Sequence, residues 1–252
     1  MININPTTAN FPGLTYTQAV AYAHKMKSAW ANILTEHLQL CPQQQGKLDE
    51  NMCEKIMEKF PNTQFRCHAN VRLLDNLHIF DASCDQSLDE NRLYLKLLTQ
   101  VTKKLNAPAY SVHAGKRNIS LDSMKDNIHR LEDLLGIPVA VEGLYPDEKN
   151  QWLLNSWKEY EWLLNSGLNM AIDLSHLQIL SYKEKHWCDD FVKALIQANT
   201  CLEIHVAGND EVHDNHQQVM GSERWIKLLD NTLTSAIIFT EENQRKTVIK
   251  RK

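Results

Sequence analysis

Eight short runs of apolar and β-branched residues alternate with longer segments of helical period along most of the chain, which has 252 residues. Alternating strands and helices predict parallel strands that are joined by right-handed crossovers. Eight such units in about 250 residues are what a (β/α)8 barrel, or TIM barrel, requires. The sequence therefore predicts an α/β fold of this class, and the eight runs are residues 2–4, 31–35, 64–68, 109–113, 138–142, 168–173, 202–206 and 236–240.

Helix start signals and apolar faces occupy the segments between the runs. Thr15 and Gln18 form a capping box, and Asp49 precedes an apolar pattern at helical spacing. Two predicted helical faces consist of Leu93, Tyr94, Leu97, Leu98 and Val101, and of Met124, Ile128, Leu131 and Leu135. Further helices are predicted at residues 157–164, 187–196 and 225–229. The short segment after the eighth run indicates that the last barrel helix is missing or reduced.

No linker rich in Pro, Gly or Ser divides the chain. Residues 1–252 are therefore predicted to form a single TIM-barrel domain, with a basic tail at about residues 245–252. A doubly wound open sheet is the alternative, although no glycine turn follows the first strand. The missing helix would leave a gap over the first and eighth strands, which either the ends of the chain or a partner protein would cover.

The chain contains only 8 glycines, and no two of them are close enough to form G-x-G. A Rossmann fingerprint, a P-loop and a nucleophile elbow are therefore excluded. No stretch approaches the roughly 18 apolar residues of a membrane span, and the N-terminus lacks the features of a signal peptide. The 6 cysteines form no C-x-x-C and are expected to be reduced thiols in a cytoplasmic protein. The net charge of −4 argues against a dedicated DNA-binding surface.

Histidines and carboxylates gather at the ends of the later runs, where the strands of such a barrel carry its active site. The set comprises His68, His113, Glu142, Asp173, His176, His205, Asp214, His216 and Glu241. Any one of these residues alone is more often an ordinary hydrogen-bonded side chain. Four carboxylates in one barrel mouth, however, repel one another unless they are paired, protonated or neutralised by cations. Together the nine residues predict a multinuclear catalytic metal site.

The ligand types of this set restrict the metal. Imidazole and carboxylate ligands together suit iron, zinc or manganese and disfavour calcium and magnesium. No cysteine belongs to the set, which argues against a structural zinc site. Bound ions of this kind lower the pKa of a bridging water, polarise a phosphoryl oxygen, or bind and activate O2. Lys116 and Arg117, which follow His113, are weaker candidates for holding an anionic group of a substrate.

The ordered set resembles that of the xylose-isomerase-like TIM barrels, and specifically of their branch with three metal ions. That branch includes the endonuclease IV type of abasic-site nuclease. It also includes the multinuclear non-heme iron-dependent oxidative enzymes that modify ribosomally made peptides. The resemblance extends from Phe65 to Glu241 and therefore covers most of the chain.

The resemblance implies a role for each residue of the set. Glu142 would bridge the first and second metal ions. The other ligands would be His68 and His113 for the first ion, Asp173, His205 and Glu241 for the second, and His176, Asp214 and His216 for the third. Glu142, His205 and Glu241 are the expected catalytic residues.

Two segments favour the oxidative branch. Residues 203–208, Glu-Ile-His-Val-Ala-Gly, and then Asp214-Asn215-His216 are similar to the His-x-Ala-Gly and Asp-x-His pattern of the oxidative enzymes. The glycine-rich run that follows Asp-x-His in endonuclease IV proteins is absent, since residues 217–220 are Gln-Gln-Val-Met. His176, within Asp-Leu-Ser-His, is instead more similar to the nuclease.

The resemblance thus implies an enzyme with two or three metal ions, with iron favoured and zinc or manganese as alternatives. It would use O2 to oxidise a peptide, with cysteine as the favoured target, and a partner protein would recruit this peptide. The first alternative is an endonuclease IV-like, zinc-dependent phosphodiesterase that acts on abasic sites in DNA. The second is a sugar isomerase or epimerase, which needs only Glu142, Asp173, His205 and Glu241 around one ion. A metal-binding protein without a substrate cleft is the non-enzyme alternative.

Overall fold

The nine strands of the described residues form one parallel sheet in the order β2-β1-β9-β8-β7-β6-β5-β4-β3. The structure, a computed structural model, describes residues 2–229 and 235–244. The basic tail predicted at about residues 245–252 lies outside these ranges. The strands are β1 (Ile2–Pro6), β2 (Ala31–Ile33), β3 (His37–Leu40), β4 (Gln64–Cys67), β5 (Tyr110–His113), β6 (Val139–Glu142), β7 (Met170–Asp173), β8 (Cys201–Val206) and β9 (Ile237–Thr240).

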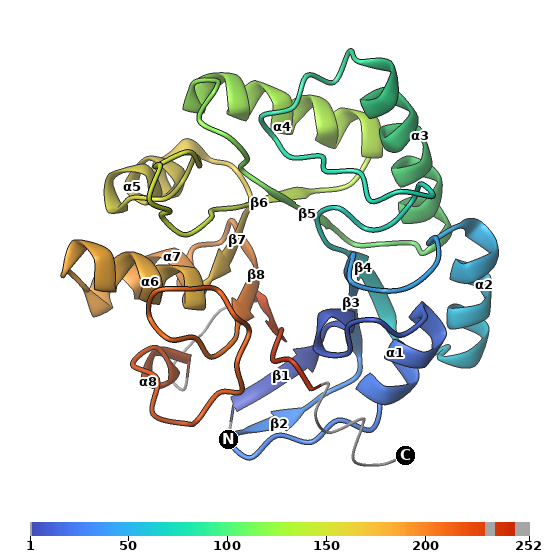
Figure 1. Cartoon of the computed structure of the whole chain (residues 1–252), viewed down its shortest axis with the longest axis horizontal. Helices are drawn as coiled ribbons and strands as arrows, with labels where there is room; N and C mark the ends of the chain where they lie inside the picture. Colours follow the sequence, from blue (N-terminus) through green and yellow to red (C-terminus); the bar gives the residue numbers. More distant parts are fainter. Residues whose placement is uncertain (1, 230–234, 245–252) are drawn as a thin grey trace.

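The sheet curls so that β3, at one end of the strand order, meets β1, the second strand from the other end (Figure 1). β1 pairs with β9, and the residue that follows β1, Thr7, forms a parallel bridge with Gln39 in β3. The side chain of Asn5 accepts a hydrogen bond from the backbone N–H of His37 at 3.2 Å, which ties the same two strands together. Eight strands, β1 and β3–β9, thus surround one axis, and the predicted α/β TIM-barrel fold is confirmed.

The second strand of the barrel differs from the prediction. Residues 31–35 were expected to supply it, but β2 lies outside the barrel at the edge of the sheet and pairs only with β1. The barrel strand is β3, which the sequence analysis did not identify because polar His37 and Gln39 alternate with its leucines. Gln39 is nevertheless fully buried, since its side-chain amide donates to the carboxylate of Glu203 at 2.7 Å.

Helices surround the strands (Figure 1). Thr15 and Asp49 cap the first two helices as predicted. The buried face of α3 is rotated from the predicted one, because Leu93 is exposed whereas Leu95 is buried. The helices are α1 (Tyr16–Ala23), α2 (Glu50–Lys59), α3 (Asp89–Lys104), α4 (Leu121–Leu135), α5 (Trp157–Ser166), α6 (Leu174–Glu184), α7 (Asp189–Gln197) and α8 (Ile226–Leu229), with the 3-10 helix η1 (Thr8–Asn10) after β1.

Helix α6 begins directly after β7 and was not predicted. Asp173 ends the strand and caps the helix, since its Oδ1 accepts from the N–H groups of Ser175 and His176. The first half of α6 is buried on all sides, so it lacks the apolar and polar faces by which a sequence pattern shows a helix. The strand and the helix therefore form one continuous segment, which brings His176 to the end of β7.

The described residues after β9, residues 241–244, contain no helix. None of the helices in the described ranges has the length and apolar character that crossing a bilayer requires. All six cysteines are free thiols.

Candidate metal centre

The parallel strands bring the predicted residues to one end of the barrel. His113 lies opposite Glu142 in the pairing of β5 with β6, and Asp173 lies opposite His205 in the pairing of β7 with β8. Six of the nine side chains are buried, namely those of His68, Glu142, Asp173, His176, His205 and Glu241. The β8–α8 loop carries the partly exposed Asp214 and His216 to the same place, as their contacts show.

Glu142 lies at the centre of the group. Its Oε2 atom is 3.3 Å from Nδ1 of His205 and 3.6 Å from Nε2 of His68. Two sets of three residues could each hold an ion, because the donor atoms within each set lie within 4.8 Å of one another. Glu142 belongs to both sets. The sets are His68, Glu142 and His205, and Glu142, Asp173 and His176. The one carboxylate is therefore placed to bridge two ions.

Asp214 and His216 continue the group on the side of His176. Oδ2 of Asp214 is 3.3 Å from Nε2 of His176 and 3.3 Å from Nε2 of His216. On its other side, Nδ1 of His216 lies 3.5 Å from Oε2 of Glu241. The Asp-x-His segment thus connects His176 with the residue that follows β9.

His113 lies beside this group, with its ring centroid 5.2 Å from that of His68. His68 shares a set of donor atoms with His205 and Glu142, and His176 shares one with Asp173 and Glu142. The division of the nine residues among three ions that the resemblance implies stays a prediction.

Burial and charge shift the pKa values of these groups in opposite directions. Burial opposes the ionisation of Glu142, but His205 and His68 outweigh it and hold the pKa of this carboxyl well below its usual range. Burial raises the pKa of Glu241 to about 7, against the opposing effect of His205 and His216. Burial, together with the neighbouring His205 and His113, lowers the pKa of His68 to about 3 against the opposing effect of Glu142, so this imidazole is neutral.

The histidines beside Asp214 behave differently. Burial disfavours their charged form, but the carboxylates of Asp173 and Asp214 raise the pKa of His176 well above its usual value. Asp214 and Glu241 likewise raise the pKa of His216 to about 9 despite its burial. Protons therefore balance the carboxylates in the metal-free protein, and a bound cation would displace them.

The residues fit a metal ion. Five buried atoms of the set have no hydrogen-bond partner: Oε2 of Glu142, Nδ1 of His205, Oδ1 of Asp214, Nδ1 of His216 and Oε1 of Glu241. Buried polar atoms rarely lack a partner, so the concentration of these five in one place fits the binding of a cation. Nitrogen and carboxylate oxygen donors without cysteine suit iron, zinc or manganese.

Four further polar residues lie beneath the set and were not predicted: Gln39, Arg66, Ser111 and Glu203. Arg66 forms an ion pair with Glu203 at 2.9 Å, and both side chains are buried. Glu203 also contacts Nε2 of His205 at 3.2 Å. One sequence signal could have identified Glu203, since it stands two residues before His205 and so points to the same face of the strand.

Gly143 positions His176 and requires the absence of a side chain. Its carbonyl oxygen lies 2.9 Å from Nδ1 of His176, which must donate because a carbonyl only accepts. A Cβ atom at residue 143 would lie 2.4 Å from the hydroxyl of Tyr160 and 2.5 Å from the carbonyl oxygen of Leu154. We expect Gly143→Ala to displace this segment and to lower the free energy of unfolding by about 1–3 kcal/mol. Thermal unfolding measures the loss, and an unchanged midpoint would contradict this packing.

Lys116 and Arg117 remain candidates for substrate binding, but Arg117 has structural contacts of its own. Its guanidinium pairs with Glu159 and donates to the backbone carbonyl of Trp152 and to Oδ1 of Asn155, each at 2.8 Å. These contacts connect the loop after β5 with the β6–α5 loop and with the first turn of α5. Lys116 is exposed.

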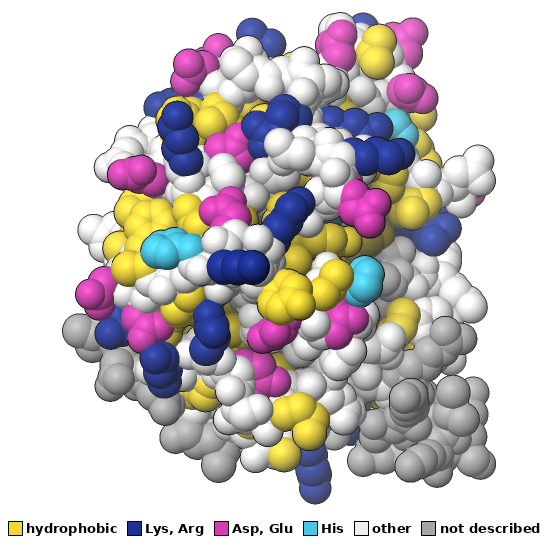
Figure 2. Space-filling view, turned by 60° about the vertical axis from the view of Figure 1, so that its left-hand side comes forward, with side chains coloured by type: hydrophobic (Ala, Val, Ile, Leu, Met, Phe, Trp, Pro, Cys, Tyr) yellow, Lys and Arg dark blue, Asp and Glu magenta, His cyan; other side chains and the backbone are white. Residues whose placement is uncertain are grey.

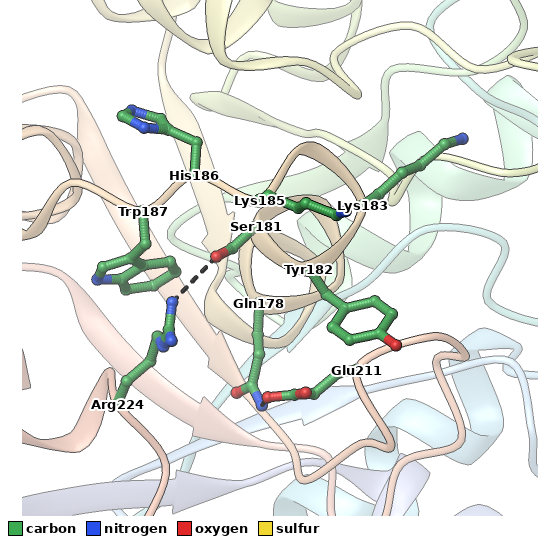
Figure 3. Close-up of a pocket in the computed structure, with 9 residues that line it drawn as sticks. All are labelled: Gln178, Ser181, Tyr182, Lys183, Lys185, His186, Trp187, Glu211 and Arg224. Carbon is green, nitrogen blue, oxygen red and sulfur yellow. Dashed lines mark hydrogen bonds between the residues drawn. The ribbon is translucent and has the colours of Figure 1, made fainter.

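A surface groove of about 550 Å³ runs along α6, whose first turn carries His176 (Figure 3). Arg224 donates to Ser181 Oγ at 3.0 Å and lies 5.3 Å from the ring centroid of Trp187. On this side of the molecule, basic, acidic and hydrophobic side chains are intermingled (Figure 2). The groove is lined by Gln178, Ser181, Tyr182, Lys183, Lys185, His186, Trp187, Glu211 and Arg224, so basic residues outnumber acidic ones.

No protein-family model matches the chain, and no curated protein matches it in sequence. Solved structures share its fold. The AP endonuclease, family 2, from Brucella melitensis has a TM-score of 0.67 at 12% identity, over 96% of this chain and 93% of that one. A D-psicose 3-epimerase solved in the presence of D-fructose has a TM-score of 0.62 at 11% identity, over 95% and 84%. A xylose isomerase domain protein from Planctomyces limnophilus has a TM-score of 0.59 at 11% identity, over 99% and 93%.

At such low identity the similarity concerns the fold alone. The chain shares its fold with these three structures over 95–99% of its length, in agreement with the predicted TIM barrel. The three structures are named for an endonuclease, an epimerase and an isomerase domain, and none of these names refers to iron or to peptide modification.

Proposed function

We propose that this chain is a multinuclear metal-dependent enzyme that uses iron and O2 to oxidise a peptide, with cysteine as the favoured target. The main support for a centre with more than one metal ion is the position of Glu142, which belongs to two sets of donor atoms. The choice of oxidation rests on the similarity of residues 203–208 and of Asp214-Asn215-His216 to the oxidative enzymes. O2 is the oxidant, so it is reduced as the peptide loses electrons.

The residues of the chain would hold the ions and control their surroundings. His68, Glu142 and His205 form one candidate binding set, and Asp173 and His176 form the second together with Glu142. When bound, the ions would supply the binding and activation of O2. The side chains of Asp214 and His216 are 13% and 31% accessible, so they mark the exposed side of the candidate metal centre. A substrate would reach the ions from this side.

An extended peptide substrate would also contact the groove along α6. None of the nine candidate ligands lines this groove, but its basic residues would attract acidic groups of a peptide. We expect the double variant Lys185→Glu and Arg224→Glu to raise the KM of an acidic peptide substrate by roughly tenfold, or about 1.4 kcal/mol. The value of kcat and the metal content should change little. An unchanged KM would show that the substrate does not use the groove.

Hydrolysis of DNA at abasic sites is the second candidate function. The fold similarity to the AP endonuclease of Brucella melitensis and the Asp-Leu-Ser-His segment around His176 favour it. A sugar epimerase or isomerase is the third, which the similarity to D-psicose 3-epimerase favours. That chemistry would need one ion.

Two assays on the same preparation distinguish these functions. Protein loaded anaerobically with ferrous iron should consume O2 and change its optical spectrum when exposed to it. Protein loaded with zinc should leave an oligonucleotide with a single abasic site intact. Incision of this oligonucleotide, with no reaction of the iron form with O2, would replace the oxidase by a nuclease. We further expect a cytoplasmic protein that acts with a partner that recruits the peptide.

A further inference from the structure

A buried polar network lies beneath the candidate metal centre and contacts two of its histidines. Glu203 accepts hydrogen bonds from three donors: Arg66 Nη1 at 2.9 Å, Gln39 Nε2 at 2.7 Å and His205 Nε2 at 3.2 Å. The side chains of Glu203 and His205 are inaccessible to solvent. The Arg66 guanidinium and the Gln39 amide nitrogen can only donate, so both carboxylate oxygens of Glu203 accept hydrogen bonds.

The contact with Glu203 determines which nitrogen of His205 is free. Because the carboxylate accepts, Nε2 of His205 must carry a proton and donate it. Nδ1 is then the remaining ligand atom, and it lies 3.3 Å from Glu142 and has no hydrogen-bond partner. The imidazole thus presents Nδ1 to the centre.

The same network reaches His68 through Ser111. The second N–H of the Gln39 amide donates to Ser111 Oγ at 3.1 Å, and this oxygen lies 3.0 Å from Nδ1 of His68. Nε2 of His68 lies on the opposite side of its ring, 3.6 Å from Glu142. His68 therefore faces the centre with Nε2, whereas His205 faces it with Nδ1.

We infer that Glu203 and Ser111 are positioning residues: Glu203 fixes the ring orientation of His205, and Ser111 fixes the opposite orientation of His68. Gln39 donates hydrogen bonds to both Glu203 and Ser111, and Arg66 forms an ion pair with Glu203. A hydrogen bond to the nitrogen that does not bind metal sets the tautomer of a ligand histidine and raises its affinity for the ion. This inference rests on the proposed metal centre. It assigns a role to four buried polar residues that lie below the predicted ligands.

Zinc binding and histidine NMR together test the inference. Zinc is the probe because it is diamagnetic and accepts these ligands. In wild-type protein labelled with 15N-histidine, we expect an exchange-protected proton on Nε2 of His205, with and without zinc. We expect Glu203→Gln to accelerate exchange of this proton and to weaken zinc binding by about 10- to 100-fold in a chelator competition.

Ser111→Ala is the second variant, and it removes only a hydroxyl group. It should weaken zinc binding by roughly tenfold and leave the Nε2 proton of His205 protected. Glu242→Gln is the matched control, because Glu242 is also a buried carboxylate but accepts from Trp30 Nε1 at 2.8 Å. The control should bind zinc as the wild type does. Circular dichroism confirms that each variant is folded.

The outcomes separate this inference from the proposed function. The inference would be overturned if Glu203→Gln bound zinc with unchanged affinity and kept its Nε2 proton of His205 equally protected. If Glu203→Gln does not fold, unchanged zinc affinity in Ser111→Ala would overturn it. Wild-type protein that binds no zinc and no iron would overturn the proposed function. Even then, the exchange of the Nε2 proton in metal-free wild type and variant would decide whether Glu203 fixes the ring.

Discussion

The variant Glu142→Gln should lose more than one metal ion per chain. Oε2 of Glu142 lies beside Nδ1 of His205 and Nε2 of His68, and Glu142 also belongs to the candidate set of Asp173 and His176. Glutamine has nearly the same shape but presents one neutral oxygen, and it cannot bridge two cations. Metal content by mass spectrometry of purified protein measures the loss, and activity should fall below detection.

Glu242→Gln serves as the control for this loss too. Glu242 is 4% accessible and adjoins the predicted ligand Glu241 in the chain, yet its carboxylate contacts Trp30 and Thr240. This variant should retain all of its metal. Retention of every ion by Glu142→Gln would refute the bridging role, and the loss of a single ion would reduce Glu142 to an ordinary ligand.

Removal of the metal should lower the melting temperature by roughly 10 °C. Four carboxylates, those of Glu142, Asp173, Asp214 and Glu241, share the end of the barrel, and cations relieve their repulsion. An ion present at about 1,000 times its Kd stabilises the folded state by about 4 kcal/mol. In a protein of this size, 1 kcal/mol corresponds to about 2–4 °C.

Differential scanning calorimetry of chelated and reloaded protein measures this shift. Reloading with the native metal should restore the original melting temperature. The Glu142→Gln protein should show a much smaller difference between its two forms. A shift below about 2 °C in the wild type would mean that the carboxylates are balanced by the histidine protons alone.

The sequence predicted where most of the candidate ligands lie in the fold, because strand ends in a parallel barrel are predictable. His113, Glu142 and Asp173 each end an apolar run, and the runs themselves are visible as buried strands. His176 was found from its spacing to Asp173, although helix α6 that carries it was not predicted. The grouping of ligands into sets depends on side-chain directions, which spacing along the chain does not determine.

The parts that were missed share one physical cause. β3 and the network under the centre place polar side chains inside the barrel, where a hydrophobic pattern leads one to expect apolar residues. Gln39 and Glu203 are buried where they hydrogen-bond each other, and Arg66 pairs with the same carboxylate. The hydrogen bond between Gln39 and Glu203 connects residues that are 164 positions apart in the sequence. The hydrophobic pattern of a short segment cannot predict such a contact.

Metal analysis of anaerobically purified protein tests the central claim most directly. The account predicts two or three iron ions per chain and an optical or Mössbauer spectrum that changes when O2 is admitted. Three zinc ions, together with incision of an abasic oligonucleotide, would support the hydrolytic alternative. A single divalent ion, or none, would contradict a multinuclear centre built around Glu142.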